Sequence, residues 1–451
     1  MENRKSATEK FIGLFTEINR GEGVTALLMT LNIFLILTAY LIAKVVREPL
    51  ILTGGGAEIK SYSSALQVVI LMGALRFYSW LAGKYPRKQL INYVTLFFVS
   101  NLILFYGLIL IGIPSGVAFF LWVGIFSLTI IAQFWSFAND VYTPDEGNRL
   151  FVIIGFGASA GGVIGPKIAG LLIDFVDVYE MLLISAGILL TSLLITNYLF
   201  RRENERLSTK KSAQSIDESE PEFSKDGAFR VVYQNKYLLL IALLMLFTNW
   251  VNTTGEYIIG RAVSDEAARL TASSPAGDFS ENTFIARFYA DYYFIVGVVG
   301  LIMQLFIVSR ILKYLGVRFA IMTLPVIAFG GYFLIALFPT MLNLLRWAKT
   351  AENATDYSLN NTVRHILFLP TTREEKYKAK VAIDSFFVRA GDVLSAAIVF
   401  VGVTWLSFSI TGFAIFNMSL VGIWLLLAFL IGRKNRELVD AVDIEKPAVT
   451  V

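Results

Sequence analysis

The sequence of 451 residues contains no cysteine and only one histidine, His365. The lack of cysteine excludes disulfide bridges and thiolate metal sites, and the sequence shows neither a metal-ligand cluster nor a recognisable Ser-His-Asp set. No GxxxxGK[ST] phosphate-binding loop occurs, which argues against ATP hydrolysis by this chain. We therefore expect no enzyme activity, no metal and no cofactor, and a structural role for His365 at a helix end.

Charged residues are also scarce, at 16%, whereas 56% of the residues are hydrophobic and the mean hydropathy is +0.63. Repeated apolar runs of about twenty residues are each long enough to cross a bilayer as a helix. We predict an all-α membrane protein with twelve transmembrane helices in two parallel six-helix halves. The predicted spans are 24–46, 61–83, 90–113, 117–139, 151–173, 179–200, 236–258, 284–309, 319–339, 341–363, 381–408 and 411–432.

Composition and charge also divide the chain into segments. We expect a cytoplasmic segment at 1–23, an N-terminal half at 24–200, a charged linker at 201–235, a C-terminal half at 236–432 and a tail at 433–451. Loops after the even-numbered spans are rich in Lys and Arg, as in KYPRK, so the positive-inside rule places both termini and the linker in the cytoplasm. The opening MENRKSATEK lacks the apolar core of a cleavable signal peptide.

An internal repeat supports the two halves. The segment FWSFANDVYTPDEGNRLFVIIGFGASAGG returns roughly 230 positions later as FLPTTREEKYKAKVAIDSFFVRAGD. The repeat aligns Glu146 with Glu375, Arg149 with Lys378, and Gly162 with Gly391; it also aligns the prolines 144 and 370. The glycines of GFGASAGGVIG are expected to let neighbouring helices approach closely.

Ionisable residues inside the predicted spans are the candidates for function, because a charge at bilayer depth is costly unless it meets water, a partner or a substrate. The candidate substrate-binding cations are Arg47, Arg76, Lys167, Arg346, Lys349 and Arg389; the candidate proton-coupling or charge-balancing acids are Glu256, Glu352, Asp356, Asp384 and Asp392. The planar guanidinium group of arginine can donate two parallel hydrogen bonds to phosphate or carboxylate oxygens, so these cations favour an anionic ligand. Two structural alternatives are that Arg76 snorkels to the membrane surface and that Arg389 and Asp392 form an ion pair between neighbouring turns.

The predicted tenth span, 341–363, is unusually polar. Arg346, Lys349, Glu352 and Asp356 recur at spacings of three and four, which places them on one face of a helix. Such a stripe requires water or a substrate beside it if the segment crosses the membrane. The alternative is a helix at the membrane surface.

The sequence resembles the ATP/ADP translocases of plastids and obligate intracellular bacteria, within the major facilitator superfamily. The resemblance lies in FWSFANDVYTPDEGNRLFVIIGFGASAG, in REPLILTGGGAEI and in KYKAKVAIDSFFVRAGD, and it covers most of the chain. It implies a nucleotide transporter. The family's first-span lysine falls on Arg47, and its lysine before Ala-x-Ile-Asp falls on Lys380.

Two glutamates of that family have no counterpart. Their positions fall near Val123 and Asn252, although Glu256 stands one turn further along. The resemblance implies that Arg47, Asn252 and Lys380 contact the substrate. The departures place the chain nearer to the broader bacterial relatives of these translocases.

Together these observations predict a secondary transporter of an organic anion, foremost a nucleotide or related phosphate compound, that works by alternating access through exchange or proton coupling. Two alternatives are a proton-coupled carrier of a non-nucleotide solute and a membrane sensor that binds a ligand without transporting it. The expected partners are the small anionic substrate and membrane lipid, with no nucleic acid. We expect a monomer in the bacterial cytoplasmic membrane.

Overall fold

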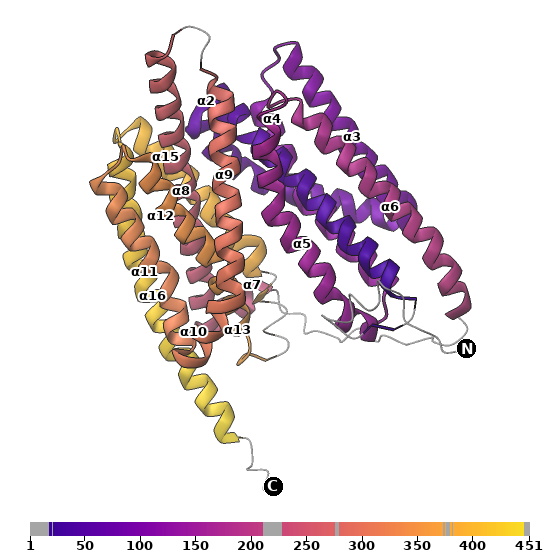
Figure 1. Cartoon of the computed structure of the whole chain (residues 1–451). Helices are drawn as coiled ribbons and strands as arrows, with labels where there is room; N and C mark the ends of the chain where they lie inside the picture. Colours follow the sequence, from indigo (N-terminus) through magenta and orange to yellow (C-terminus); the bar gives the residue numbers. More distant parts are fainter. Residues whose placement is uncertain are drawn as a thin grey trace. The chain divides into compact units, whose positions relative to one another are not determined.

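The computed structural model describes residues 18–19, 21–210, 228–275, 279–372, 375, 379–380 and 382–445, and all regular elements in these residues are helices (Figure 1). The predicted segment 1–23, linker 201–235 and tail 433–451 lie partly outside the described residues, as does Lys378. The helices are α2 Gly23–Lys84, α3 Arg87–Leu110, α4 Gly116–Val141, α5 Pro144–Leu172, α6 Met181–Lys210, α7 Ala228–Gln234, α8 Lys236–Ser273, α9 Glu281–Ile302, η1 Met303–Ile307, α10 Val308–Tyr314, α11 Gly316–Leu337, α12 Leu342–Thr355, η2 Asp356–Asn360, α13 Asn361–Ile366, η3 Ile383–Phe387, α15 Val388–Thr404 and α16 Ile410–Glu445.

Ten helices among the described residues are long and apolar enough to cross a membrane. One of them, α2, has 62 residues and would be roughly 90 Å long if straight, about three times the hydrocarbon thickness. It is interrupted at Gly56, whose φ of 73° lies outside the helical region, and it covers two of the predicted spans. The polar run α12–η2–α13 occupies the predicted tenth span. The all-α membrane architecture is therefore confirmed, and the helices are consistent with twelve crossings.

The chain forms two compact units. Unit 1 comprises Met1–Gly54, Val69–Ser219 and Ser280–Phe294, and unit 2 comprises Gly55–Val68, Glu220–Phe279 and Ile295–Val451. In unit 1 the core holds a series of packed rings, with Trp122 stacked on Phe126 at 5.2 Å and Phe98 edge-on to Phe126 at 5.0 Å. In unit 2, α8 packs against α15 and α16, and α11 packs against α16 and α12. The predicted division at the linker stays a prediction.

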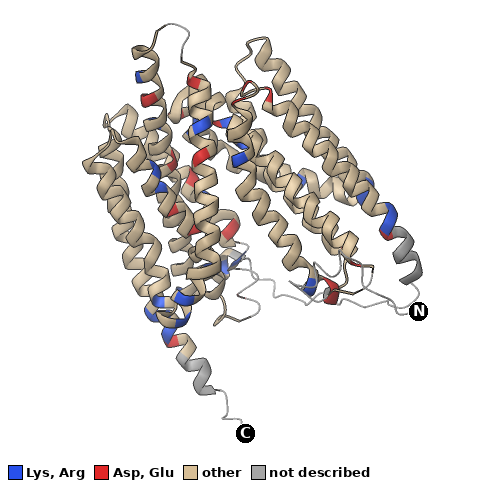
Figure 2. Cartoon of the chain, viewed as in Figure 1, with Lys and Arg blue, Asp and Glu red and all other residues tan. Residues whose placement is uncertain are grey.

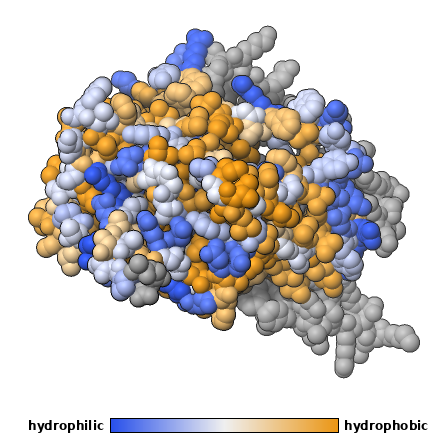
Figure 3. Space-filling view, turned by 90° about the horizontal axis from the view of Figure 1, so that it is seen from above, coloured by the Kyte–Doolittle hydropathy of each residue, from blue (hydrophilic) through white to orange (hydrophobic). Residues whose placement is uncertain are grey.

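The outer faces of the helices are apolar, as lipid requires. Large hydrophobic side chains that are more than half exposed occur on α3, α6, α11 and α16, including Phe97, Leu110, Leu194, Val326 and Leu426. Hydrophobic side chains cover much of the surface seen in Figure 3. An apolar surface of this extent is expected of a multi-pass membrane protein and not of a monomer in water.

Glycines bring α5 against α2, as the sequence predicted. A Cβ atom at Gly157 would lie 2.4 Å from the carbonyl oxygen of Thr30, and one at Gly161 would lie 2.7 Å from that of Phe34. Both distances are far below van der Waals contact, so only glycine allows this approach. The prediction of close helix packing by GFGASAGGVIG is confirmed.

This packing gives a testable result for Gly157→Ala. The added methyl group must push α2 away from α5, so we expect the free energy of unfolding to fall by about 1–3 kcal/mol. Gly162→Ala is the matched control, because no atom lies within 4 Å of the position of its Cβ. Thermal unfolding in detergent should show a lower midpoint for Gly157→Ala only; equal midpoints would contradict the packing argument.

The repeated turn has the same local structure in both copies. Thr143 caps α5 and Glu146 closes a capping box, with Thr143 N donating to Glu146 Oε2 at 3.0 Å. In the second copy Thr372 N donates to Glu375 Oε2 at 3.0 Å, and Glu375 N donates to Thr372 Oγ1. Reciprocal contacts of this kind satisfy backbone groups at the start of a helix. The sequence repeat therefore corresponds to a repeated pair of reciprocal hydrogen bonds.

Candidate functional site

Many charged residues lie near helix ends, but others are placed along the length of the helices (Figure 2). The most deeply buried cation is Lys349 on α12, whose side chain is only 1% exposed. Its Nζ lies 3.0 Å from Glu352 Oε1, 3.0 Å from Asn252 Oδ1 and 3.9 Å from Glu256 Oε1. The structure thus brings four predicted site residues together around one ammonium group. We call these four residues the Lys349 cluster.

Two neighbouring residues that the sequence analysis did not single out complete the hydrogen bonding of this cluster. Tyr332 on α11 donates to Glu352 Oε2 at 3.0 Å, and Asn353 Nδ2 donates to Glu256 Oε1 at 2.9 Å. Tyr332 lies in a span without charged residues, so nothing in its sequence context marked it. Every partner of Glu352 named here stabilises its ionised form.

A glycine on α8 makes room for the cluster. A Cβ atom at Gly255 would lie 2.1 Å from the hydroxyl oxygen of Tyr332 and 2.7 Å from Nζ of Lys349. The ammonium and the hydroxyl therefore lie directly against the α8 backbone. Any larger residue at position 255 would displace both groups.

A second cluster in unit 2 surrounds Asp392 on α15. Its Oδ1 accepts from Asn249 Nδ2 at 2.8 Å and from Thr253 Oγ1 at 2.8 Å, and its Oδ2 accepts from Arg389 Nη1 at 3.4 Å. The close approach is possible because Gly391 contacts α8, where a Cβ would lie 2.7 Å from the backbone nitrogen of Trp250. Arg389 and Asp392 are thus an ion pair within one helix, the structural alternative considered from the sequence.

The remaining cation of α12, Arg346, has no ion pair among the described residues, and its Nε is buried without a hydrogen-bond partner. The hydroxyl of Thr350, one turn further along α12, is likewise buried without a partner, and Thr350 is 2% exposed. Asp356 begins the π-helical turn η2 and accepts from Asn360 Nδ2 at 2.7 Å. Arg346 and Thr350 therefore differ from Lys349, whose hydrogen-bonding capacity is used within unit 2.

The other predicted residues of unit 2 lie apart from these clusters. Asp384, at the π-helical turn η3, forms an ion pair with Arg364 at the end of α13. Lys380 Nζ lies 3.3 Å from His365 Nδ1. His365 thus contacts a predicted substrate residue, although only a structural role was expected for it.

In unit 1, Arg47 and Glu48 form an ion pair on α2. Glu48 is completely buried and also accepts from the hydroxyl of Tyr293 at 2.9 Å. The guanidinium of Arg47 lies 4.6 Å from the ring centroid of Phe120, and the ammonium of Lys44 lies 4.1 Å from that of Tyr293. Arg47 is thus held by an acid and an aromatic face, and Lys44 lies against the ring of the tyrosine that donates to the same acid.

The last two predicted cations are exposed. Lys167 on α5 lies 5.4 Å from the ring centroid of Phe294 and has no ion pair among the described residues. Arg76 lies on the outer part of α2 with no ion pair in the part of the chain that the structure describes. Lys167 and Arg76 therefore have no balancing carboxylate in the described part of the chain.

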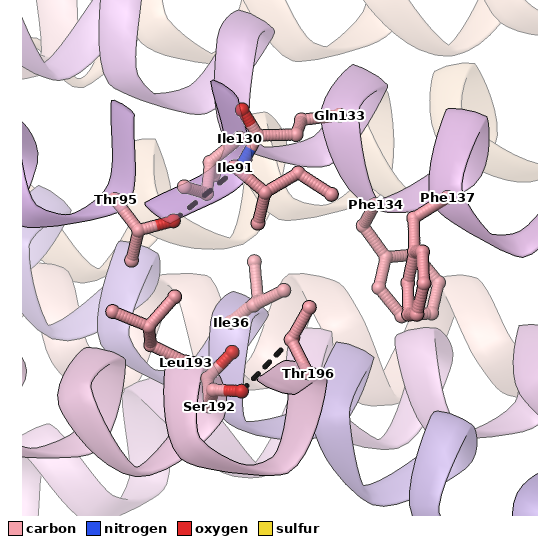
Figure 4. A pocket seen from close by; sticks show the side chains of 10 residues that line it. All are labelled: Ile36, Ile91, Thr95, Ile130, Gln133, Phe134, Phe137, Ser192, Leu193 and Thr196. Atoms are coloured by element: carbon pink, nitrogen blue, oxygen red, sulfur yellow. Dashed lines mark hydrogen bonds between the residues drawn. The ribbon is translucent and has the colours of Figure 1, made fainter. Parts of the chain in front are cut away.

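A small cavity of about 20 Å³ lies in unit 1 between α2, α3, α4 and α6 (Figure 4). Polar groups line one part of it: Gln133 Nε2 donates to Thr95 Oγ1 at 3.4 Å, and Thr196 Oγ1 donates to the carbonyl of Ser192 at 3.0 Å. A space of this size holds about one water molecule. It contains none of the predicted site residues and is too small for an organic anion.

Comparison with known proteins identifies the family. The sequence profile of the Major Facilitator Superfamily matches residues 22–349, which is most of the chain. The chain belongs to the Major Facilitator Superfamily. Members of this superfamily are secondary transporters, so the family and fold are those of membrane transporters and not of enzymes.

Within the superfamily the chain is related to ATP/ADP carriers, as its motifs indicated. It is 24% identical over 310 residues to ADP,ATP carrier protein 1 of Chlamydia pneumoniae, covering 59% of this chain and 56% of that one. The carrier of the same name from Chlamydia trachomatis is 24% identical over 309 residues, covering 54% of its length. The chain thus spans little more than half the length of the curated relatives it matches.

Solved structures share the fold. The nucleoside transporter NupG has a TM-score of 0.61 at 12% identity, covering 90% of this chain and 98% of its own. A bacterial homolog of the human lysosomal transporter Spinster has a TM-score of 0.58 at 13% identity, covering 96% of this chain and 99% of its own. At these identities the likeness shows the fold alone.

Proposed function

We propose that the cargo of this secondary transporter is an organic anion, foremost a nucleotide or a related phosphate compound, moved by alternating access. The observation that carries the proposal is Arg346. This guanidinium lies in the most polar helix of unit 2; among the residues that the structure describes it has no carboxylate partner, and its buried Nε lacks a hydrogen bond. Buried donors in native proteins are almost always satisfied, so an anionic oxygen is the natural partner.

The neighbours of Arg346 fit a phosphate compound. The hydroxyl of Thr350 is a second unsatisfied group one turn away. The side chain of Tyr357, two turns after Thr350, is 59% exposed, and we propose that its ring stacks on a base. A guanidinium, a hydroxyl and an aromatic ring form a suitable set for phosphate and base.

Unit 1 contributes further cations to the proposal. Arg47 takes the position of the substrate-binding lysine of the ATP/ADP translocases, and Lys167 carries a charge that no carboxylate among the described residues balances. The relation to the Chlamydia carriers supports a nucleotide among the possible anions. Lys349 and Arg389 are proposed to act together with their acids, because both are ion-paired.

The setting that we propose is the bacterial cytoplasmic membrane, with both termini and the 201–235 linker on the cytoplasmic side. The support is the distribution of Lys and Arg over the loops after the even-numbered spans. Cysteine labelling from either side of the membrane tests it, because the chain has no native cysteine.

The test is uptake of labelled ATP and ADP by proteoliposomes with and without internal nucleotide. Stimulation by internal nucleotide supports exchange, accumulation driven by an acidic exterior supports proton coupling, and binding without flux supports a membrane sensor that does not transport its ligand.

We expect Arg346→Gln to weaken uptake about tenfold to a hundredfold, because the free energy of one charge-assisted hydrogen bond corresponds to a change of that size. Arg269→Gln is the control, because that arginine is 66% exposed and pairs with Glu266. Equal losses in both variants would contradict a substrate contact at Arg346.

A second candidate is a proton-coupled carrier of a non-nucleotide solute. The Lys349 cluster favours it, because two carboxylates surround one ammonium. The same proteoliposomes distinguish the candidates: for this second candidate labelled ATP and ADP would not be taken up, whereas a labelled uncharged solute such as a nucleoside would accumulate when the exterior is made acidic.

A further inference from the structure

The junction between α10 and α11 brings several cations together at one end of unit 2. Arg310 and Lys313 lie on α10 and Arg318 lies in the first turn of α11, and all three side chains are exposed. Only Leu315 separates the two helices, because Gly316 adopts a φ of 77° that suits glycine. Figure 2 shows a group of Lys and Arg residues where α10, α11 and α16 meet. We call this group the α10–α11 corner.

The three cations of the corner have no carboxylate partner in the described part of the chain. Arg310 donates to the carbonyl of Phe306, and Lys313 Nζ lies 5.4 Å from the ring centroid of Tyr314. The sequence from 303 to 337, which contains all three cations, has no Asp or Glu. The contacts therefore position the cations and leave their charge available to an anion.

Helix α16 holds Arg318 in place. A Cβ at Gly432 would lie 2.9 Å from Cγ of Arg318, so the stem of the arginine lies directly on the α16 backbone. Its guanidinium lies 5.0 Å from the ring centroid of Phe429. The two cations that follow Gly432 share one acid, Glu437. The end of α16 thus fixes one cation of the corner and adds to its positive charge.

The corner lies where membrane helices end. The helices that meet there are each long and apolar enough to cross a membrane: Glu281–Tyr314, Gly316–Leu337 and Ile410–Val439. Three large side chains beside the cations are at least half exposed, namely Tyr314, Leu315 and Phe319. Tyrosine is enriched at the level of the lipid headgroups, and exposed apolar side chains suit acyl chains. The ligand that fits both features has an anionic headgroup and a hydrocarbon tail.

We propose that the α10–α11 corner binds the phosphate headgroup of an anionic phospholipid. Lys and Arg next to a membrane span attract anionic headgroups, and the guanidinium of Arg318 can donate two parallel hydrogen bonds to a phosphodiester. The acyl chains of the lipid then lie along Leu315 and Phe319. The site is separate from the candidate cargo residues, so this inference does not depend on the proposed function.

Unit 1 has a related corner with a different charge balance. The dipeptide Lys-Tyr at 84–85 aligns with the one at 313–314 in the repeat. In unit 1, however, Arg87 Nε donates to Asp140 Oδ2 at 2.7 Å. A cation that already has a carboxylate partner attracts a phosphate less strongly. We therefore place the headgroup site in unit 2 and use Arg87 as a control.

The experiment measures binding of a fluorescent phosphatidylglycerol to the full chain in detergent micelles. Each Lys or Arg near an anionic lipid contributes roughly fivefold to its affinity, so Lys313→Gln/Arg318→Gln should bind about thirtyfold more weakly than wild type. The matched control is Arg87→Gln/Arg269→Gln, which removes two arginines that each have a carboxylate partner and should bind as wild type does. Phosphatidylcholine, which has no net charge, should not compete.

A second measurement keeps every cation. The chain has no native cysteine, so an environment-sensitive fluorophore on Ser309→Cys reports on the corner, and one on Ser273→Cys reports on the end of α8. Both serines are exposed. Added phosphatidylglycerol should change the emission of the label at 309 and leave that of the label at 273 unchanged.

Four results would overturn the inference: equal binding of phosphatidylcholine, equal affinities in the two double variants, equal responses of the two labels, or displacement of the lipid by inorganic phosphate or ATP. The last result would show that the corner binds a free phosphate compound and not a lipid. None of them bears on the proposed function, which uptake of ATP tests separately.

Discussion

Replacing Lys349 with glutamine is expected to abolish transport and to lower the free energy of unfolding by about 3–5 kcal/mol, the range for breaking a buried ion pair. The loss is large because Glu352 would stay buried with only Tyr332 to stabilise its charge, while Asn252 would lose its charged donor. Glu256 would also lose the ammonium that lies 3.9 Å from its Oε1. Thermal unfolding in detergent and ATP uptake by proteoliposomes measure the two effects.

The double variant Lys349→Gln/Glu352→Gln separates stability from function. Removing both charges leaves no isolated buried ion, so most of the lost stability should return. Transport should stay absent, because the ammonium that contacts Asn252 and Glu256 is still missing. A single Lys349→Gln variant as stable as wild type would contradict the buried pair, and a double variant with normal transport would contradict any functional role for it.

The sequence predicted those parts of the fold that depend on local pattern. Apolar runs gave the membrane helices, and the spacing of Lys349 and Glu352 correctly placed them on one face of a helix. The repeated turn predicted two equivalent helix starts, because a capping box needs only four consecutive residues. Each of these features is decided within a few residues of the chain.

Features that depend on distant residues could not be predicted. Tyr332 contacts Glu352 only because Gly255, far away in sequence, leaves space on α8. Gly162 and Gly391 align in the repeat, yet a Cβ at Gly162 would meet open space and one at Gly391 would meet the backbone of α8. The repeat therefore preserves the helix start but not the packing after it.

The π-helical turns were also outside the reach of sequence patterns. Two of them, η2 and η3, begin at or next to the predicted acids Asp356 and Asp384. A π turn inserts one extra residue per turn and so changes which side chains share a face. The α-helical spacing of three and four residues therefore placed Lys349 and Glu352 on one face correctly. It does not predict the positions of side chains in the π-helical turn that follows α12.

Replacing Arg47 with glutamine is expected to reduce the affinity for ATP about tenfold to a hundredfold, because a charged hydrogen-bond donor contributes about 1.5–3 kcal/mol. Its guanidinium is held against Phe120 and Glu48, so it is already oriented before a ligand arrives. Arg47→Lys should recover part of the affinity, since lysine keeps the charge but not the planar fork that binds two oxygens. Binding of labelled ATP to the purified protein measures all three forms.

The control must account for Glu48, which is completely buried and would lose its charge partner in Arg47→Gln. Comparing Arg47→Gln/Glu48→Gln with Glu48→Gln alone removes this complication, because neither form leaves an ionised Glu48. If Arg47 contacts the cargo, the double variant binds ATP at least tenfold more weakly than Glu48→Gln. If the two bind ATP equally, Arg47 serves only to neutralise Glu48, and the anion must be held by other cations such as Lys167 and Arg346.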